Sequence, residues 1–246
     1  FLQEDGEFIY NGDEPLLAER AAKLSQDKST FGFADSDSIH ASDLRSTMHH
    51  SFFKINGTDR EFSIPMIGRH NVANAMAAIL VGRHFGESDE EIAAGLANFV
   101  PTANRMEWEK GDCGEDIMSD IYNSNPTAVK AVTASFGQVP VSEGGRRIAV
   151  LADMLELGSR SADLHKGLAA CLDPDKINVL YLYGPEMNHL YQALLDKYGQ
   201  QNLHYYPEDE MSHLIDDLKS DIHSQDIVLL KGSHGMHLER VLDRLK

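Results

Sequence analysis

Apolar runs alternate with amphipathic segments along the second half of the chain. The runs predict strands and are DIMSDI, RRIAVLA, INVLYLY, NLHYY and DIVLLK. Segments with helical spacing of apolar residues lie between or after them, at 126–138, 161–172, 186–198, 208–220 and 234–246. This alternation is typical of a largely parallel sheet with helices on both faces. The unbroken apolar run of RRIAVLA further predicts a strand that is buried on both faces.

The first part of the chain has a different pattern, in which short β-like pieces precede two helices. Residues 49–66, HHSFFKINGTDREFSIPM, alternate apolar and polar positions around Asn56-Gly57, which favours a β-hairpin. Residues 71–86 predict a helix of small residues that ends in glycine. Residues 88–99 predict a second helix, which Ser88 caps at its amino end.

The change of pattern near Pro101 divides the chain into two parts. We predict that residues 1–103 form a β-rich part. We predict that residues 104–246 form a doubly wound α/β domain with a mostly parallel sheet, of a length that is typical of one domain.

The composition is typical of a globular protein and disfavours some classes of binding partner. The chain has 246 residues, of which 42% are hydrophobic, so it can bury a substantial core. Its formal net charge of −17 disfavours nucleic acid and anionic membranes as partners. No apolar run approaches the roughly 18–20 residues that span a bilayer, and no signal peptide is recognisable. Two cysteines without CxxC spacing argue against disulfides and zinc clusters and favour a cytoplasmic location.

Polar residues cluster where the predicted parallel strands end. In open α/β sheets, ligands bind beyond the carboxyl ends of the strands. The residues at these ends are Asp120, Tyr122, Asn123 and Asn125 after the first strand, Asp153, Met154 and Glu156 after the second, Tyr183 and Gly184 after the third, and residues 231–236 after the fifth. The pattern therefore predicts a ligand site at this rim of the sheet.

Each of these loops also has a purely structural interpretation. Asn125 before Pro126 is a good N-cap, although capping does not account for the other polar residues of the same turn. Asp153 and Glu156 fit a solvated turn. The sequence KGS at 231–233 resembles part of a phosphate loop, but the full G-x-x-x-x-G-K-[ST] pattern is absent.

The histidines predict no metal site. Twelve occur, without an HExxH motif or a convincing i, i+4 pair. His49 and His50 lie in a predicted strand, where adjacent side chains point to opposite faces. His189 and His237 are expected at the surface, whereas His165 fits either packing or a ligand contact.

Five motifs occur in an order that is highly specific as a set. They are GRHNVANAMAA (68–78), NRMEW (104–108), SDIYNSNPTAV (119–129), LADMLELG (151–158) and VLLKGSHGM (228–236). Together they resemble the Mur ligases of peptidoglycan synthesis. DxYNxNP and DMxELG resemble the branch of that family that adds D-Ala-D-Ala to a UDP-N-acetylmuramoyl-tripeptide. The resemblance covers nearly the whole chain.

The resemblance implies the last part of a central α/β ATPase domain, followed by a complete C-terminal Rossmann-like domain. It also implies an ATP-dependent amide ligase that works through an acyl phosphate, with Mg²⁺ as cofactor. The family's GTNGKT loop, magnesium-binding glutamate and carbamylated lysine have no counterpart in this sequence, nor does its UDP-binding domain. No catalytic residue is therefore assigned within the chain, and we expect the chain alone to be inactive.

The resemblance assigns seven residues to ATP, namely His70, Asn71, Asn74, Arg105, Asp120, Tyr122 and Asn123. The two amides of the helix would lie against the adenine, because an amide can both donate to and accept from a base edge. Asp120 would accept from the ribose hydroxyls, and Arg105 would reach the phosphates when the two domains close.

The candidates for the D-Ala-D-Ala site are Asn125, Asp153, Glu156, Lys231, Gly232 and Ser233. The lysine and backbone amides of KGS suit a carboxylate, and an acid of DMLELG suits an ammonium group. Typical family motifs have glycine where this chain has Asn104 and Ala152. The second departure bears on how closely a ligand approaches the backbone.

Two other functions remain open. A folylpolyglutamate-type or cyanophycin-type amide ligase would share the domain order but should lack YNxNP and DMxELG. A non-catalytic nucleotide-binding module would bind ATP without an upstream half. For the Mur ligase interpretation, the expected partners are the small molecules ATP, D-Ala-D-Ala and UDP-MurNAc-tripeptide, and we expect a monomer that binds neither nucleic acid nor membrane.

Overall fold

The computed structural model describes residues 3–246 and contains two compact units. One unit ends at Val100, and the other begins at Pro101. Each unit has its own sheet and its own apolar core. No helix within residues 3–246 has the length and apolar character needed to cross a membrane.

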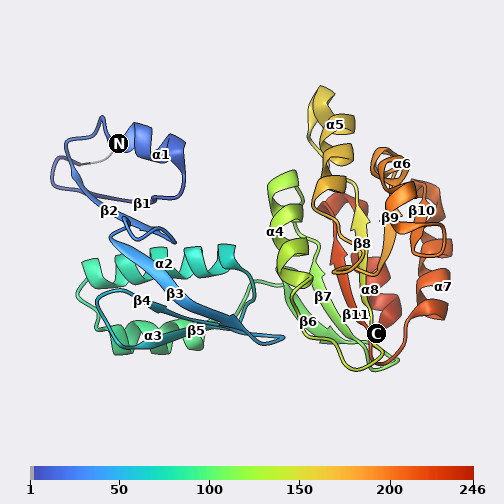
Figure 1. Cartoon of the computed structure of the whole chain (residues 1–246), viewed down its shortest axis with the longest axis horizontal. Helices are drawn as coiled ribbons and strands as arrows, with labels where there is room; N and C mark the ends of the chain where they lie inside the picture. Colours follow the sequence, from blue (N-terminus) through green and yellow to red (C-terminus); the bar gives the residue numbers. More distant parts are fainter. Residues whose placement is uncertain (1–2) are drawn as a thin grey trace. The chain divides into compact units, whose positions relative to one another are not determined.

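The first unit is built on a five-stranded mixed sheet (Figure 1). Its strands lie in the order β1–β2–β3–β4–β5, with bounds Glu7–Asn11, Asp27–Gly32, Ile39–Ser46, Ser51–Ile55 and Glu61–Ile64. β1, β2 and β3 run parallel, whereas β4 is antiparallel to both β3 and β5. The antiparallel pair β4–β5 confirms the predicted hairpin, and Gly57 in its connection has a φ of +80°.

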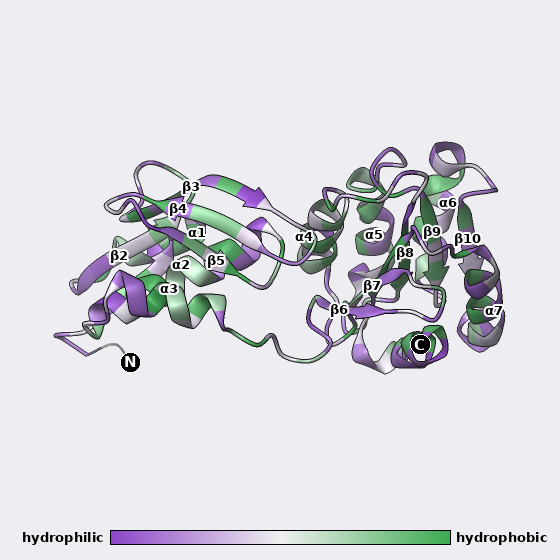
Figure 2. Ribbon diagram, turned by 90° about the horizontal axis from the view of Figure 1, so that it is seen from below, coloured by the Kyte–Doolittle hydropathy of each residue, from purple (hydrophilic) through white to green (hydrophobic). Residues whose placement is uncertain are grey.

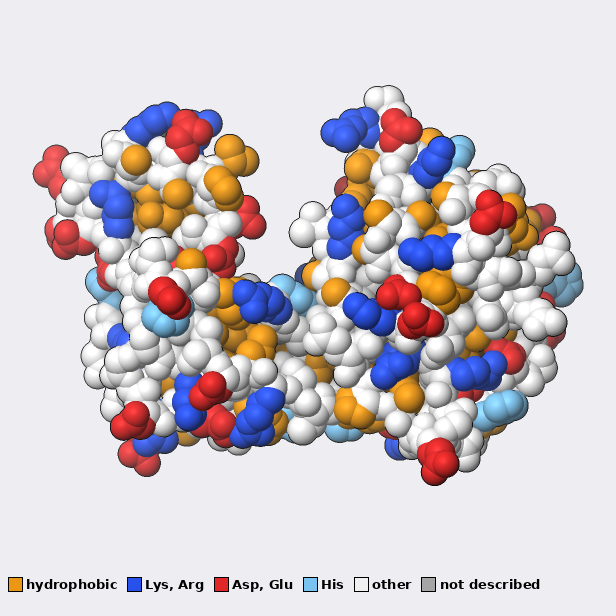
Figure 3. All heavy atoms as spheres, viewed as in Figure 1, with side chains coloured by type: hydrophobic (Ala, Val, Ile, Leu, Met, Phe, Trp, Pro, Cys, Tyr) orange, Lys and Arg blue, Asp and Glu red, His pale blue; other side chains and the backbone are white. Residues whose placement is uncertain are grey.

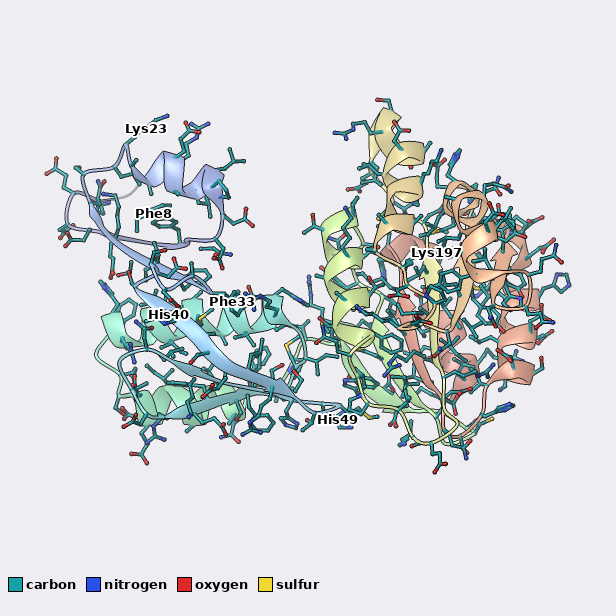
Figure 4. The ribbon with its side chains drawn as sticks, in the orientation of Figure 1. Phe8, Lys23, Phe33, His40, His49 and Lys197 are labelled. Atoms are coloured by element: carbon teal, nitrogen blue, oxygen red, sulfur yellow. The ribbon has the colours of Figure 1, made fainter. Side chains whose placement is uncertain are left out.

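Two features of the first unit differ from the sequence prediction. His49 and His50 lie in the turn between β3 and β4 and not in a strand. Thr47 closes this turn, because its backbone N–H donates to the His50 carbonyl and its Oγ1 accepts from the His50 N–H. A short helix, α1 (Pro15–Ala21), was not predicted. Figure 4 labels Phe8 of β1, and the side chain of this residue lies between β1 and α1.

Two longer helices complete the first unit. α2 (Arg69–His84) packs against β1, β2 and β3, and α3 (Asp89–Ala97) packs against β5. Ser88 forms a full capping box at the start of α3, which confirms the predicted N-cap. The core contains Ile39, Phe53, Ile55, Phe62, Ile64, Val72, Met76 and Ile79. Figure 3 shows further hydrophobic side chains at the surface around β1 and α1, where Leu16 is 74% exposed.

The second unit is a doubly wound α/β domain, as predicted. Its six strands lie in the order β10–β9–β8–β11–β7–β6. They span Leu203–Tyr206, Val179–Tyr183, Arg147–Ala152, Ile227–Lys231, Asp116–Asp120 and Glu107–Lys110, respectively. All neighbouring pairs are parallel except β6 and β7. β8, β9 and β11 are buried along their whole lengths apart from the first residue of β8, and β8 and β9 are largely green, or hydrophobic, in Figure 2.

Helices cover both faces of this sheet. The α-helices are α4 (Pro126–Phe136), α5 (Ser161–Lys166), α6 (Met187–Tyr198), α7 (Met211–Asp221) and α8 (Glu239–Leu245). Four 3₁₀ turns accompany them: η1 (Gly158–Arg160), η2 (Gly167–Ala170), η3 (Glu208–Glu210) and η4 (His234–Met236). α7 and α8 share one core with the strands. On the other side, α6 contacts α5 and η2, and Lys197 of α6 donates to the carbonyl of Ala169 (Figure 4).

Candidate functional site

The carboxyl ends of β7, β11 and β8 lie side by side in the second unit. β11 is the middle strand, and Lys231 at its end is in register with Asp120 of β7 and Leu151 of β8. The residues that follow β7, β8 and β11 therefore share one edge of the sheet, where ligands bind in open α/β folds.

Lys231 is enclosed beneath this edge, with its side chain 1% exposed. Its Nζ lies 3.1 Å from Asp120 Oδ2 and 3.2 Å from the Asp120 carbonyl oxygen, and it also donates to the Asn123 carbonyl. Burial lowers the pKa of Lys231, although the charge of Asp120 acts in the opposite direction. The ammonium group thus faces the turn and not the solvent, and the predicted contact with a dipeptide carboxylate stays a prediction.

Arg105 and Tyr122 form a stack next to this turn. The guanidinium carbon of Arg105 lies 4.4 Å from the centre of the Tyr122 ring, and Tyr122 is 53% exposed. A guanidinium group over a ring face makes a cation–π contact, and Arg105 is also exposed. Its N–H donors are therefore accessible to an anion from the solvent.

Asn104 sets the course of the chain into Arg105. It has a φ of +61°, its carbonyl accepts from the Ile121 N–H, and its Oδ1 accepts from the Ser119 hydroxyl. Glycine is common at positions of positive φ, and asparagine tolerates them better than most residues. The departure from glycine at this position is therefore structurally mild.

The turn between β7 and α4 combines a cap with exposed groups. Asn125 is the N-cap of α4, because its Oδ1 accepts from the Ala128 N–H at 2.9 Å. The side chain of Asn123 is exposed, whereas Ser124 is buried. The structural interpretation of Asn125 is thus confirmed, and its Oδ1 is used within the protein.

Asp153 caps a neighbouring helix. Its Oδ2 accepts from the Glu186 N–H at 3.1 Å, and its Oδ1 accepts from the Met187 N–H at 2.8 Å. The side chain is buried, and Gly184 lies so close that a β-carbon there would be 2.5 Å from the carboxyl carbon. Burial raises the pKa of Asp153, partly offset by these two amide donors. Asp153 therefore holds the start of α6, and the predicted contact with the ammonium group of a substrate stays a prediction.

The sequence left two roles open for His165, packing or a ligand contact, and the structure shows that it packs inside the domain. It is fully buried, its Nε2 accepts from the Met154 N–H at 2.9 Å, and its Nδ1 lies 2.9 Å from the Ser161 carbonyl. The first contact requires an unprotonated Nε2, so Nδ1 carries the proton and donates to Ser161. The exposed positions of His189 and His237 confirm the prediction for both residues.

The loops after β8 and β11 are joined by Ser233. Its Oγ accepts from the Leu155 N–H at 2.9 Å, and its own N–H donates to the Asp153 carbonyl at 3.3 Å. The Ser233 hydroxyl proton remains available to an acceptor. Glu156 is exposed, with a φ of +64°. Leu155 lies in the same loop as Glu156 and is 42% exposed. The sequence analysis did not single it out, although an apolar residue in a polar loop could have indicated it.

The candidates in the first unit lie at the start of α2. Asn71 is buried, and its amide group donates to the Ile67 carbonyl at 2.8 Å. His70 is half-buried and Asn74 is exposed, so the two asparagines differ in accessibility although they are three residues apart. The guanidinium of Arg69 lies 3.4 Å from the ring centre of Phe33, which Figure 4 labels beside α2.

Within residues 3–246, no group of three or more His, Cys, Asp or Glu side chains is arranged to hold a metal ion. The polar edge of the second unit instead offers hydrogen-bond acceptors and the exposed guanidinium group of Arg105. These groups suit an organic ligand that carries hydroxyls and anionic oxygens.

Comparison with known families identifies the class of protein. Residues 104–234 match the Mur ligase glutamate ligase domain, and residues 1–82 match the Mur ligase middle domain. The chain belongs to the Mur ligase family.

Within this family, the chain is similar to ligases of one name. The chain is 36% identical to UDP-N-acetylmuramoyl-tripeptide--D-alanyl-D-alanine ligase of Bacillus subtilis over 99% of its own length and 52% of that protein. It is 26% identical to the protein of the same name from Buchnera aphidicola, again over 99% of this chain and 52% of the relative. The chain thus spans about half the length of the curated relatives it matches.

Solved structures share the fold. MurF from Acinetobacter baumannii matches with a TM-score of 0.82 and 24% identity, over 98% of this chain and 51% of that one. MurF ligase from Thermotoga maritima in complex with ADP matches with a TM-score of 0.80 and 22% identity, over 99% of this chain and 53% of that one.

Proposed function

We propose that the protein containing this chain joins D-Ala-D-Ala to UDP-MurNAc-tripeptide with the energy of ATP. The two relatives named above are ligases for this substrate pair, which supports the proposal. The observation that carries the proposal is the stack of Arg105 on Tyr122 beside Asp120, at the carboxyl end of a parallel strand. We further propose a cytoplasmic location, which suits the two free cysteines.

The second unit supplies groups for the ribose and phosphates of ATP. Asp120 uses Oδ2 for Lys231, so Oδ1 can accept from ribose hydroxyls. Arg105 presents its exposed N–H donors to phosphate oxygens while it stacks on Tyr122. Asn123 has an exposed amide on the same turn. These groups hold the nucleotide and stabilise the charge that spreads over the phosphates during transfer.

Polar residues at the start of α2, in the first unit, are candidates for contact with an adenine base. Asn74 is exposed and offers both a donor and an acceptor to an adenine edge. Asn71 has a different role, because its buried amide fixes the turn that precedes α2 through the Ile67 carbonyl. His70 directly precedes Asn71 at the start of the helix.

The loops after β8 and β11 supply groups for D-Ala-D-Ala. The free hydroxyl proton of Ser233 suits the dipeptide carboxylate, and the exposed carboxylate of Glu156 suits its ammonium group. Gly232 lies between Ser233 and the end of β11, and its lack of a side chain lets it pack against Ala152. Asn125 contributes through its side-chain NH₂ group, because its oxygen caps α4.

The reaction proceeds through an acyl phosphate. The tripeptide carboxylate takes the γ-phosphoryl group of ATP and releases ADP, and the dipeptide amine then displaces phosphate from the acyl carbon. The residues of this chain bind and orient the two ligands. Mg²⁺ neutralises phosphate charge in such reactions. Because residues 3–246 hold no cluster of metal ligands, we assign its ligands to other parts of the protein.

A chimera tests the proposed function. The first half of the Bacillus subtilis relative is joined upstream of this chain, and phosphate release is measured with ATP, UDP-MurNAc-tripeptide and D-Ala-D-Ala. We expect release that requires all three compounds and forms the pentapeptide product. Replacement of the dipeptide by glutamate should abolish release. Turnover with glutamate, or ATP hydrolysis that ignores both substrates, would instead support a different amide ligase or a different class of protein.

A further inference from the structure

Lys231 connects two strands that are far apart in the sequence. It ends β11, and its register partner Asp120 ends β7, more than a hundred residues earlier in the chain. Because the two strands are parallel neighbours, the lysine side chain extends from one strand end into the turn that follows the other.

The ammonium group is fully used inside the protein. A lysine ammonium has three donors, and three oxygens surround this one: Asp120 Oδ2, the Asp120 carbonyl and the Asn123 carbonyl. With 1% of the side chain exposed, Lys231 has neither a free donor nor a path to a ligand. Its partners are instead Asp120 and Asn123, which are the first and last residues of the turn that carries Tyr122.

The contacts of Lys231 fix the position of the Asp120 carboxylate. A buried cation needs a counter-charge, and Asp120 provides it. The pairing occupies one carboxylate oxygen and leaves the other available, with the side chain of Asp120 17% exposed. The two carbonyl contacts hold the backbone on both sides of Tyr122, so the ring that supports Arg105 depends on the same lysine.

We propose that Lys231 is a positioning residue of the nucleotide site, which acts through Asp120 and the turn 120–123 and makes no contact with the dipeptide. This inference rests on the proposed function, in which Asp120 binds the ribose. Lys231 keeps the Asp120 carboxylate aimed at the ligand, and Asp120 then distinguishes a ribose from a sugar without hydroxyls.

The test compares ATP with 2′,3′-dideoxy-ATP in the chimera described above. We measure KM for both nucleotides and for D-Ala-D-Ala in the parent and in the variants Lys231→Met, Lys231→Arg, Asp120→Asn and Ser233→Ala. In the parent, loss of the ribose hydroxyls should raise the nucleotide KM about tenfold or more. We call the KM for 2′,3′-dideoxy-ATP divided by the KM for ATP the ribose ratio. In Lys231→Met, the ribose ratio should fall towards one while the dipeptide KM changes by less than about twofold.

The other variants identify which idea fails. Ser233→Ala should raise the dipeptide KM and leave the ribose ratio intact. Lys231→Arg keeps a cation and should retain part of the ratio. If Asp120→Asn lowers the ratio but Lys231→Met does not, or if Lys231→Met raises mainly the dipeptide KM, the positioning role is overturned and the proposed function survives. If Asp120→Asn leaves the ratio unchanged, the assigned nucleotide site is wrong and the inference is lost with it.

A second measurement uses the unmodified chain and does not depend on a variant that folds. The side-chain ammonium signal of Lys231 in ¹⁵N-labelled protein should be protected from exchange with water, because three acceptors enclose it. It should shift on addition of ADP and stay in place on addition of D-Ala-D-Ala. A signal that exchanges freely, or that responds to the dipeptide alone, would overturn the proposal.

Discussion

Ala152 at the end of β8 and Gly232 at the end of β11 lie so close that a β-carbon on Gly232 would be 2.8 Å from the β-carbon of Ala152. The alanine at position 152, where the family motif usually has glycine, is tolerated because its neighbour has no side chain. The two positions together determine how tightly the loops after β8 and β11 approach each other.

Gly232→Ala should therefore destabilise the second unit. The added methyl group would meet Ala152 and, at 3.0 Å, the side chain of Leu238. We expect a loss of about 1–3 kcal/mol in the free energy of unfolding, measured by urea denaturation. The double variant with Ala152→Gly should recover part of this loss. A single variant as stable as the parent would show that the strand ends separate easily.

Tyr122→Ala should weaken nucleotide binding by removing the surface on which Arg105 rests. A cation–π contact at an exposed site contributes about 0.5–1 kcal/mol, so we expect a few-fold increase in Kd for ADP by calorimetry. Tyr122→Phe retains the ring and is the matched control. Equal losses in the two variants would assign the effect to the phenolic hydroxyl and not to the stack.

Asp153→Ala should loosen the first turn of α6. The variant removes the acceptors of the Glu186 and Met187 amides, which should cost about 1–2 kcal/mol of stability and speed hydrogen exchange at those two amides. The affinity for D-Ala-D-Ala should stay nearly constant in the chimera. A large rise in the dipeptide KM with an intact fold would support the role in substrate binding that the sequence suggested.

Arg146 and Asp226 should make the second unit sensitive to acid. Burial alone would raise the pKa of Asp226, but hydrogen bonds from the Arg146 side chain and from the amides of His223 and Arg146 hold it below its usual value of 3.8. A lowered pKa stabilises the folded state above the unfolded value and loses that effect as the pH falls through the folded value. Stability should therefore decline below about pH 4.

Asp226→Asn is the control for this pH dependence. At neutral pH it should cost about 2 kcal/mol, because Arg146 keeps Asp221 as a second partner 2.9 Å away. It should also flatten the decline of stability in acid. An unchanged acid profile in the variant would assign the decline to other carboxyl groups.

The sequence predicted the second unit well, because β8, β9 and β11 are apolar runs of the kind that a parallel sheet with helices on both faces buries. β6 was not predicted, since EWEK is short and lies at the antiparallel edge of the sheet. α1 was missed for a similar reason, as its seven residues begin at a proline that also fits a turn.

The candidate site shows where reasoning from sequence stops. The rule for strand ends placed Asp120, Asp153 and Lys231 at the correct edge. It gives the position of a residue along the chain, but not whether the side chain faces the solvent or a neighbouring backbone group. Lys231 and Asp153 turn inward and bind carbonyl and amide groups whose positions depend on the complete fold.

The most direct test of the nucleotide site is a titration of the ¹⁵N-labelled chain with ADP, followed by NMR. We predict that the amide signals of Arg105, Asp120, Tyr122 and Asn123 shift together in a saturable manner, and that Asp120→Asn abolishes these shifts. Binding of ADP that leaves these four signals unchanged and perturbs another part of the second unit would contradict the assignment.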